Sequence, residues 1–166
     1  HVDLIDEGYD VVIRINPRPD SQLVGRCFHR DDLLLVAPAD LARPPDAETP
    51  VSLVAGSSAP VLQKRGLIDG NSERHVTLKT VLRLPSPLMV RDAVVAGAGV
   101  GILPRMLIAR SLEQGLVQDW GCLVDVRIEL WALHASRRLT SARIVAFLDF
   151  LSGEMPSFLR STLCAG

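Results

Sequence analysis

Residues 92–104 have the sequence Asp-Ala-Val-Val-Ala-Gly-Ala-Gly-Val-Gly-Ile-Leu-Pro. The first residues are typical of a short apolar helix that ends at Gly97, and the run from Val100 to Leu103 predicts a buried strand. A dinucleotide-binding fingerprint needs its glycines after a strand and at the start of a helix, where backbone N–H groups meet a pyrophosphate. Here the glycines follow a helix. We therefore predict that Gly97 or Gly99 supplies a left-handed helix cap and turn, and not a phosphate site.

The composition is that of a globular chain. Its 166 residues, 48% of them hydrophobic, suffice for one domain or two small lobes. No apolar run approaches the roughly 20 residues of a membrane span, and the first residues lack the basic end and apolar centre of a signal peptide. Cys27, Cys122 and Cys164 are odd in number and far apart, which favours a reducing, cytoplasmic location. No pair of them has metal-ligand spacing.

The charge balance argues against nucleic-acid binding by this chain alone. Eighteen Lys and Arg residues face nineteen Asp and Glu, which gives a net charge of −1. Nucleic-acid affinity depends on clustered cations that neutralise phosphates. The one basic doublet, Arg137-Arg138, is typical of an exposed turn. We expect this stretch of chain to bind DNA poorly.

Strand and helix patterns alternate along the chain. Apolar runs predict strands at residues 10–15, 33–37, 51–55 and 75–84 (with Val76, Leu78 and Leu82 inward), and alternating apolar residues predict a strand at 124–133. An exposed hairpin turn is predicted at 64–73, with Gly70-Asn71 at its tip. Helices are predicted at 2–7, 87–96, from Pro104 to Gly115, and from Thr140 to Pro156 with Ile144, Phe147, Leu148 and Leu151 buried. This alternation indicates an α/β sheet, and crossings near Arg30 and Val126 indicate two lobes.

Four segments resemble the effector-binding domain of LysR-type transcriptional regulators. Residues 3–14, Asp-Leu-Ile-Asp-Glu-Gly-Tyr-Asp-Val-Val-Ile-Arg, are similar to the family's Asp-Leu-hydrophobic-x-Glu-Gly-x-Asp-hydrophobic-x-Ile-Arg pattern. Three later segments follow in the family's order. Residues 33–41 are similar to its Val-Ala-x-Pro-x-x-Leu segment, 95–104 to its Ala-Gly-x-Gly-Ile-x-x-x-Pro run, and 137–151 to its Arg-Arg-x-hydrophobic-Ser-x-Arg-x-x-x-Phe-x-x-Phe-Leu ending.

The resemblance implies an α/β, periplasmic-binding-protein-like (type 2) fold. Lobe I would comprise residues 1–30 and 127–166, and lobe II residues 31–126. The family places a further strand–helix–strand unit and a winged helix-turn-helix DNA-binding domain upstream, so we interpret the chain as truncated at its N-terminus. The implied partners are a small-molecule effector, and DNA only through the absent domain. An uncovered strand edge in lobe I would favour a homo-oligomer.

Serines at the ends of predicted elements form the first candidate site. Ser57 and Ser58 follow a buried strand, where open α/β sheets present hydroxyls and backbone N–H groups to ligands. An ordinary turn is the alternative. Ser86 suits the N-cap of a helix whose first residue is Pro87. That helix start would suit a carboxylate ligand, and a purely structural cap is the alternative.

A second candidate group consists of Arg14, Asn16, Pro17 and Glu129. Arg14 ends a strand, where its guanidinium would bind a carboxylate ligand or pair with Asp10 or Glu129. The resemblance places Asn16 and Pro17 at the mouth of the effector cleft. Glu129 lies on the strand that returns to lobe I, where a buried acid needs Arg14 or a cationic ligand group as its partner.

No catalytic, cofactor or metal site is predicted. The segment Gly56-Ser57-Ser58 lacks the second glycine of a nucleophile elbow, and the histidines have neither triad context nor metal-ligand spacing. We therefore expect a sensor that binds a small anionic metabolite between two lobes, and not an enzyme. The alternative is an extracytoplasmic solute-binding protein of the same fold, and an enzyme on an α/β scaffold ranks third.

Overall fold

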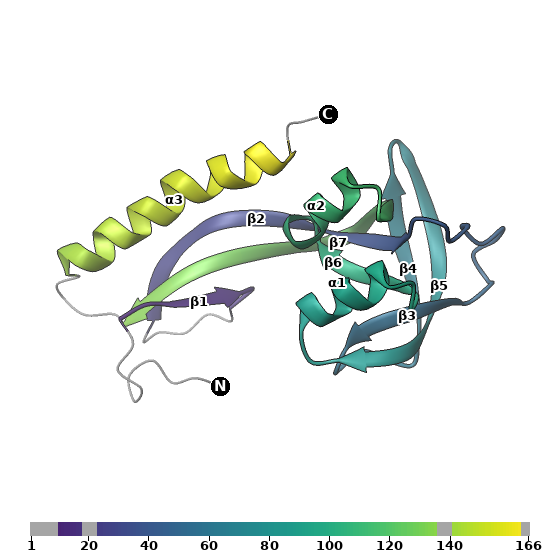
Figure 1. Ribbon diagram of the computed structural model, residues 1–166. Coiled ribbons are helices and arrows are strands. Elements are labelled where there is room, and N and C mark those ends of the chain that lie inside the picture. Colours follow the sequence, from purple (N-terminus) through teal and green to yellow (C-terminus); the bar gives the residue numbers. More distant parts are fainter. Residues whose placement is uncertain (1–9, 18–22, 136–140, 164–166) are drawn as a thin grey trace. The chain divides into compact units, whose positions relative to one another are not determined.

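The computed structural model describes residues 10–17, 23–135 and 141–163 (Figure 1). The chain divides into two compact units. Unit 1 contains His1–Asp31 and Ile128–Gly166, and unit 2 contains Asp32–Arg127. The predicted helix at residues 2–7 and the predicted cap at Thr140 lie outside the described residues.

Two long strands, β2 (Leu23–Pro38) and β7 (Val117–Ala135), contribute to both units. Both are longer than predicted, because the sequence indicated strands only at 33–37 and 124–133. Residues 33–37 are continuously apolar, and residues 124–133 alternate between apolar and charged side chains over most of their length. The first part of β2 instead carries exposed and charged side chains, such as Arg26 and Arg30, which lack an apolar strand pattern.

Unit 2 is built on a mixed sheet. Its strands lie in the order β2, β6 (Val100–Pro104), β3 (Val51–Gly56), β5 (Ser72–Leu84) and β4 (Leu62–Asp69), and β7 pairs with β4. β3 is parallel to both β5 and β6, and the other pairs are antiparallel. Parallel strands need a crossover connection, and helix α1 (Pro87–Val95) lies in the connection from β5 to β6. The α/β prediction is confirmed.

The β4–β5 hairpin differs from the prediction in two ways. Gly70 and its neighbour Asn71 form the turn as predicted, but residues 64–69 are paired in β4. Leu82, predicted inward, is 39% exposed. The cause is a β-bulge: Leu53 of β3 pairs with Thr80, but the next residue of β3 pairs with Leu82. The skipped residue reverses the in–out alternation of β5 from that point.

The predicted left-handed helix cap is confirmed at Gly97. Helix α1 is followed by Gly97 with a φ of 85°. Its N–H donates to the carbonyl oxygen of Val94 at 3.0 Å, and Ala98 N–H donates to that of Ala93 at 2.9 Å. These two bonds satisfy the last carbonyls of the helix. Helix α2 (Arg105–Glu113) likewise starts and ends at the predicted places.

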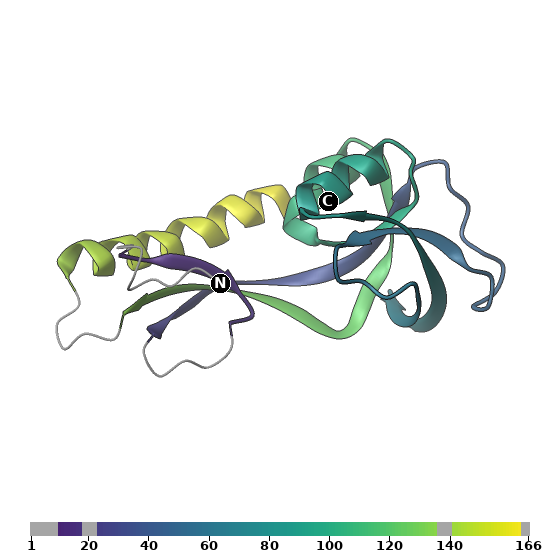
Figure 2. The ribbon, with the colours of Figure 1, turned by 90° about the horizontal axis from the view of Figure 1, so that it is seen from below.

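The core of unit 2 occupies both faces of its sheet. Leu34 and Val36 of β2 pack with residues of α1 and α2, whereas Leu35 and Ala37 pack on the opposite face, with β4 and β5 residues. Figures 1 and 2 show α1 and α2 together on one face. A strand covered on both faces loses the apolar–polar alternation, which explains why residues 33–37 form a continuous apolar run.

Unit 1 combines three strands with helix α3 (Ala142–Leu163). β1 (Val12–Ile15) pairs antiparallel with β7, which lies beside β2. Leu148 and Leu151 of α3 pack against Phe28 of β2 and Ala132 of β7. Figure 1 shows α3 lying along one side of these strands.

Helix α3 departs from the prediction at two positions. Phe147 is 41% exposed, because the buried stripe runs through Leu148 and Leu151 and leaves its neighbour outside. Pro156 lies inside the helix and does not end it. A proline removes one helical hydrogen bond and favours a kink, yet the chain can continue as a helix beyond it. Within the described part of the chain, no helix is both long and apolar enough to cross a membrane.

Candidate functional site

The predicted serines lie at one edge of unit 2. Ser57 and Ser58 follow β3, and Ser86 follows β5. Because β3 and β5 are parallel and Gly56 pairs with Leu84, the two segments leave the sheet side by side. The structure therefore brings Ser57, Ser58, Ser86 and Pro87 to a common edge, which we call the carboxyl edge of unit 2.

Ser86 caps helix α1. Its backbone is extended (φ −127°, ψ 137°), and its Oγ accepts a hydrogen bond from Leu88 N at 3.3 Å. Pro87 occupies the first helical turn, where its missing N–H leaves no helical bond unmade. That turn contains no acidic residue. The partial positive charge of the helix start is therefore not neutralised by its own first turn.

The turn that carries Ser57 and Ser58 is held by its neighbours. Ala59 N donates to Gly56 O at 3.1 Å, which closes the turn. Arg83, on the adjacent strand, donates from Nε and Nη2 to Ala59 O at 3.3 and 3.1 Å. Both serines are exposed. Their hydroxyls thus lie on a fixed turn beside the positive charge of Arg83.

Sequence reasoning missed two contributors to this edge, Arg83 and the start of helix α2. β6 is also parallel to β3, with Val54 paired to Gly101, so Pro104 and Arg105 leave the sheet at the same edge. Arg105 lies 3.7 Å from a carboxylate oxygen of Asp119. Only the strand order could have revealed this grouping, since nothing in a linear motif joins residues 57, 86 and 105. Hydroxyls, two helix starts and cationic groups together suit an anion.

The second predicted group lies in unit 1, where Asn16 and Glu129 are joined. Asn16 N donates to Glu129 O at 2.9 Å, and Glu129 N donates to Asn16 Oδ1 at 2.7 Å. Asn16 has a φ of 45°, a left-handed conformation that asparagine tolerates better than most residues. Arg14 precedes it on β1, opposite Trp131, and Pro17 follows it.

The bonding partners of the Glu129 carboxylate differ from those predicted. It is half-buried, with 35% of the side chain exposed, and its Oε1 accepts from Arg30 Nε at 2.9 Å. Its Oε2 accepts from Trp131 Nε1 at 3.0 Å. The expected partner was Arg14 or a ligand cation. Arg30 lies on β2 and was not predicted as a partner, because a separation of 99 residues leaves no local signal.

Acid should weaken unit 1 through Glu129. The hydrogen bond from Arg30, and then that from Trp131, lower the pKa of Glu129 below its ordinary value of 4.5. A group with a lowered folded-state pKa stabilises the fold above its unfolded pKa, and this stabilisation is lost as pH falls through the folded pKa. We expect Glu129→Gln to be less stable than the wild type by a constant amount near neutral pH. The difference should shrink on acidification below about pH 4.5.

Urea unfolding at a series of pH values measures this difference. Glu113→Gln, at an exposed position in α2, is the matched control and should show a smaller change. A wild-type advantage over Glu129→Gln that persists unchanged to pH 2 would contradict the assignment.

Among the described residues there is no group of three or more metal-binding side chains.

A protein-family model described as the LysR substrate binding domain matches residues 1–156. The chain belongs to this family. The chain is 25% identical over 173 residues to the Probable HTH-type transcriptional regulator LtrA of Klebsiella pneumoniae. That match covers 94% of this chain and 54% of LtrA, so the domain spans about half the length of that relative.

Solved structures of LysR-type regulators share the fold of this domain. The regulatory domain of CrgA from Neisseria meningitidis superposes with a TM-score of 0.71 at 19% identity, covering 90% of this chain and 77% of that chain. Full-length AphB from Vibrio cholerae gives a TM-score of 0.65 at 21% identity, covering 92% and 54%. The predicted periplasmic-binding-protein-like (type 2) fold is confirmed.

Proposed function

We propose that this LysR substrate-binding domain binds a small anionic effector at the carboxyl edge of unit 2, as the sensing part of a transcriptional regulator. The register of β3 and β5, in which Gly56 pairs with Leu84, carries the proposal. It places the exposed hydroxyls of Ser57 and Ser58 beside the start of α1. Ligands of open α/β sheets bind outside the carboxyl ends of the strands.

The chemistry of the edge favours a negative charge. The first turn of α1 has no acidic residue, and Arg83 of β5 donates two hydrogen bonds to Ala59 O in the turn that carries the two serines. A helix start attracts anions through its N–H groups and its partial positive charge. A carboxylate of a small metabolite meets these requirements, because it accepts hydrogen bonds from hydroxyl and N–H donors alike.

We extend the proposal to unit 1. Units 1 and 2 would be lobes I and II, and Arg14, Asn16, Pro17 and Glu129 would contribute effector contacts from lobe I. The two bonds between Asn16 and Glu129 make this corner rigid, which suits a ligand-binding surface. DNA binding and the final oligomeric state would belong to the longer protein.

Ser86→Asp tests the site directly. Aspartate caps a helix about as well as serine, so the stability of α1 should be kept, while the added carboxylate should repel an anionic ligand. A panel of small carboxylates is screened by thermal shift against the wild type, and each stabilising compound is titrated by calorimetry. We expect the Ser86→Asp variant to bind each stabilising carboxylate at least about tenfold more weakly than the wild type does.

Two controls separate binding from folding. Ser86→Ala removes the cap, and should cost about 1 kcal/mol of stability. Ser52→Ala changes an exposed serine within β3 and should alter neither property. If Ser86→Asp binds every active carboxylate as tightly as the wild type does, the serine is a structural cap and the proposed site is wrong.

The regulatory part of the proposal is tested in the full-length protein. An effector alters DNA affinity only if it binds two conformations of the protein unequally. The active carboxylate should therefore shift the mobility-shift titration of the wild type and leave that of Ser86→Asp unchanged. Loss of basal DNA binding in that variant would point to a folding defect instead.

A further inference from the structure

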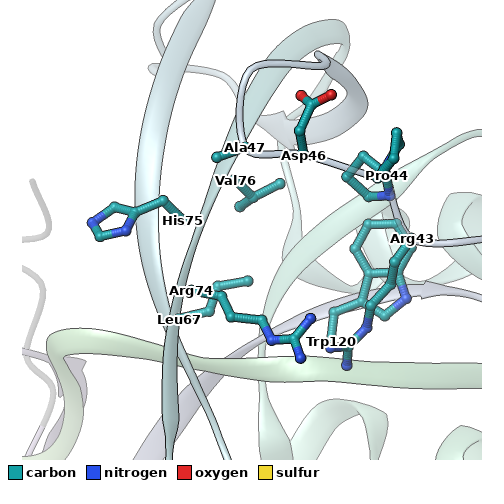
Figure 3. Close-up of a pocket in the computed structure, with 10 residues that line it drawn as sticks. Arg43, Pro44, Asp46, Ala47, Leu67, Arg74, His75, Val76 and Trp120 are labelled. Carbon is teal, nitrogen blue, oxygen red and sulfur yellow. The ribbon is translucent and has the colours of Figure 1, made fainter.

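We propose that unit 2 carries a second ligand site, which takes an aromatic carboxylate. A pocket of about 300 Å³ lies between the loop that joins β2 to β3, strands β4 and β5, and Trp120 of β7 (Figure 3). It lies at the start of β3 and β5, where Val51 pairs with Leu78. Ser57 and Ser86 follow the other ends of these strands, so the pocket is separate from the carboxyl edge.

The walls of the pocket are apolar and closely packed. Leu67 and Val76 are each 4% exposed, and Trp120 is 2% exposed. Pro44 and Ala47 face them from the loop. Pockets that hold small ligands are mostly apolar with a few convergent polar groups, and a volume of about 300 Å³ is at the lower end of their range. Such a slot suits a flat hydrocarbon body.

The loop that forms one wall is already fixed. Gln118 Nε2 donates to Pro38 O at 3.0 Å and to Leu41 O at 2.6 Å. Thr77, which is buried, donates from Oγ1 to Ala47 O at 2.6 Å. A ligand would therefore find the wall in place, and binding would order little additional chain.

Two guanidinium groups lie at the pocket, and they differ in whether a carboxylate is bonded to them. Arg43 lies 6.0 Å from the centre of the Trp120 ring and bonds to the carboxylate of Asp69 and, at 3.0 Å, to Asp119 O. Its charge is thus balanced by Asp69. Arg74 is exposed, makes no hydrogen bond or ion pair among the described residues, and acts on Asp69 only through its more distant charge, which lowers the pKa of that carboxyl less than Arg43 does. Figure 3 shows it extending from β5 toward Arg43 and Trp120.

The other ionisable groups of the lining do not compete for this charge. Asp46 Oδ1 accepts from Glu48 N at 2.9 Å and from Thr49 N at 2.7 Å, so this carboxylate is committed to its own loop. The imidazole of His75 points away from the pocket (Figure 3). Arg74 is therefore the cation that remains for a ligand, and its planar fork matches a carboxylate.

The indole N–H of Trp120 is a second, independent indication of a ligand. Trp120 Nε1 is buried and has no acceptor among the described residues. Buried donors are nearly always paired, and an unpaired one is costly. Because Nε1 is itself covered, a carboxylate on Arg74 would reach it only after a small rotation of the Trp120 ring, and the aromatic body of the ligand would lie against Leu67 and Val76.

The test uses 2-naphthoate as the probe and NMR of ¹⁵N-labelled protein as the readout. The chain has two tryptophans, so it gives two indole N–H signals, which Trp131→Phe assigns. We expect naphthoate to shift the Trp120 signal in a saturable way and to leave the Trp131 signal in place. The uncharged 2-naphthamide should bind at least about tenfold more weakly, because it cannot form the charged pair with Arg74.

Charge-removal variants locate the site. Arg74→Gln should weaken naphthoate binding at least about tenfold. Lys79→Gln removes the same charge from an exposed position on the same strand and should leave binding unchanged. Ser86→Asp should also leave it unchanged, so the failure of one site does not imply failure of the other. Absence of a Trp120 shift at millimolar naphthoate, or equal binding of the amide, would overturn the proposal.

Discussion

The Gly99→Ala variant is expected to lose about 3 to 5 kcal/mol of unfolding free energy, a large share of the stability of a small domain. Gly99 has a φ of 143°, which strains any residue with a side chain. A Cβ at this position would also lie 2.5 Å from the carbonyl oxygen of Ser52 on the neighbouring strand. Strand β3 would have to move away from the turn before β6.

Gly97→Ala is the matched control for this experiment. Gly97 also has a positive φ, of 85°, but a Cβ there would meet no atom within 4 Å. Its replacement should cost only the backbone strain, about 1 kcal/mol. Urea unfolding of both variants separates the two effects. Equal losses for the two variants would show that the close approach to Ser52 does not contribute.

The second large effect is expected at Leu53. This side chain is 1% exposed at the centre of β3 and belongs to the core cluster that includes Leu35, Leu78 and Val100. Leu53→Ala removes buried apolar atoms and leaves a cavity that the neighbouring strands cannot fully close. We expect a loss of about 2 to 5 kcal/mol.

The neighbouring residue provides the comparison. Ser52 lies on the same strand with its side chain exposed, so Ser52→Ala should change the unfolding free energy by less than about 0.5 kcal/mol. Chemical denaturation at 25 °C measures both variants. A loss below about 1 kcal/mol for Leu53→Ala would mean that the core repacks around the missing atoms and that β3 is not its rigid centre.

Features decided by a few adjacent residues could be predicted from the sequence. Ser86-Pro87 marked the start of α1, and Gly97 marked its end, because caps depend on local backbone geometry and short-range hydrogen bonds. The prediction that Leu82 points inward was wrong, because this feature is not decided by adjacent residues. A bulge is set by the partner strand, and the sequence of β5 alone does not contain it.

In the candidate sites, too, the individual residues could be predicted from local sequence, but their grouping in space could not. Ser57 and Ser86 could each be selected by their place after an apolar strand, but their proximity depends on the parallel register of β3 with β5. The pocket was not predicted at all. Its main contributors, Arg43, Arg74 and Trp120, come from a loop and two strands and form no motif, so only the folded chain brings them together.

The two long strands have a consequence for the order of folding. Unit 2 is one uninterrupted segment, Asp32–Arg127, whereas unit 1 is assembled from the two segments on either side of it. The ion pair between Arg26 and Asp149 therefore joins residues 123 positions apart. Contacts this distant in sequence form slowly, because the loop between them must first be closed. During synthesis unit 2 can fold while the last helix is still unmade, and unit 1 is completed only when α3 arrives.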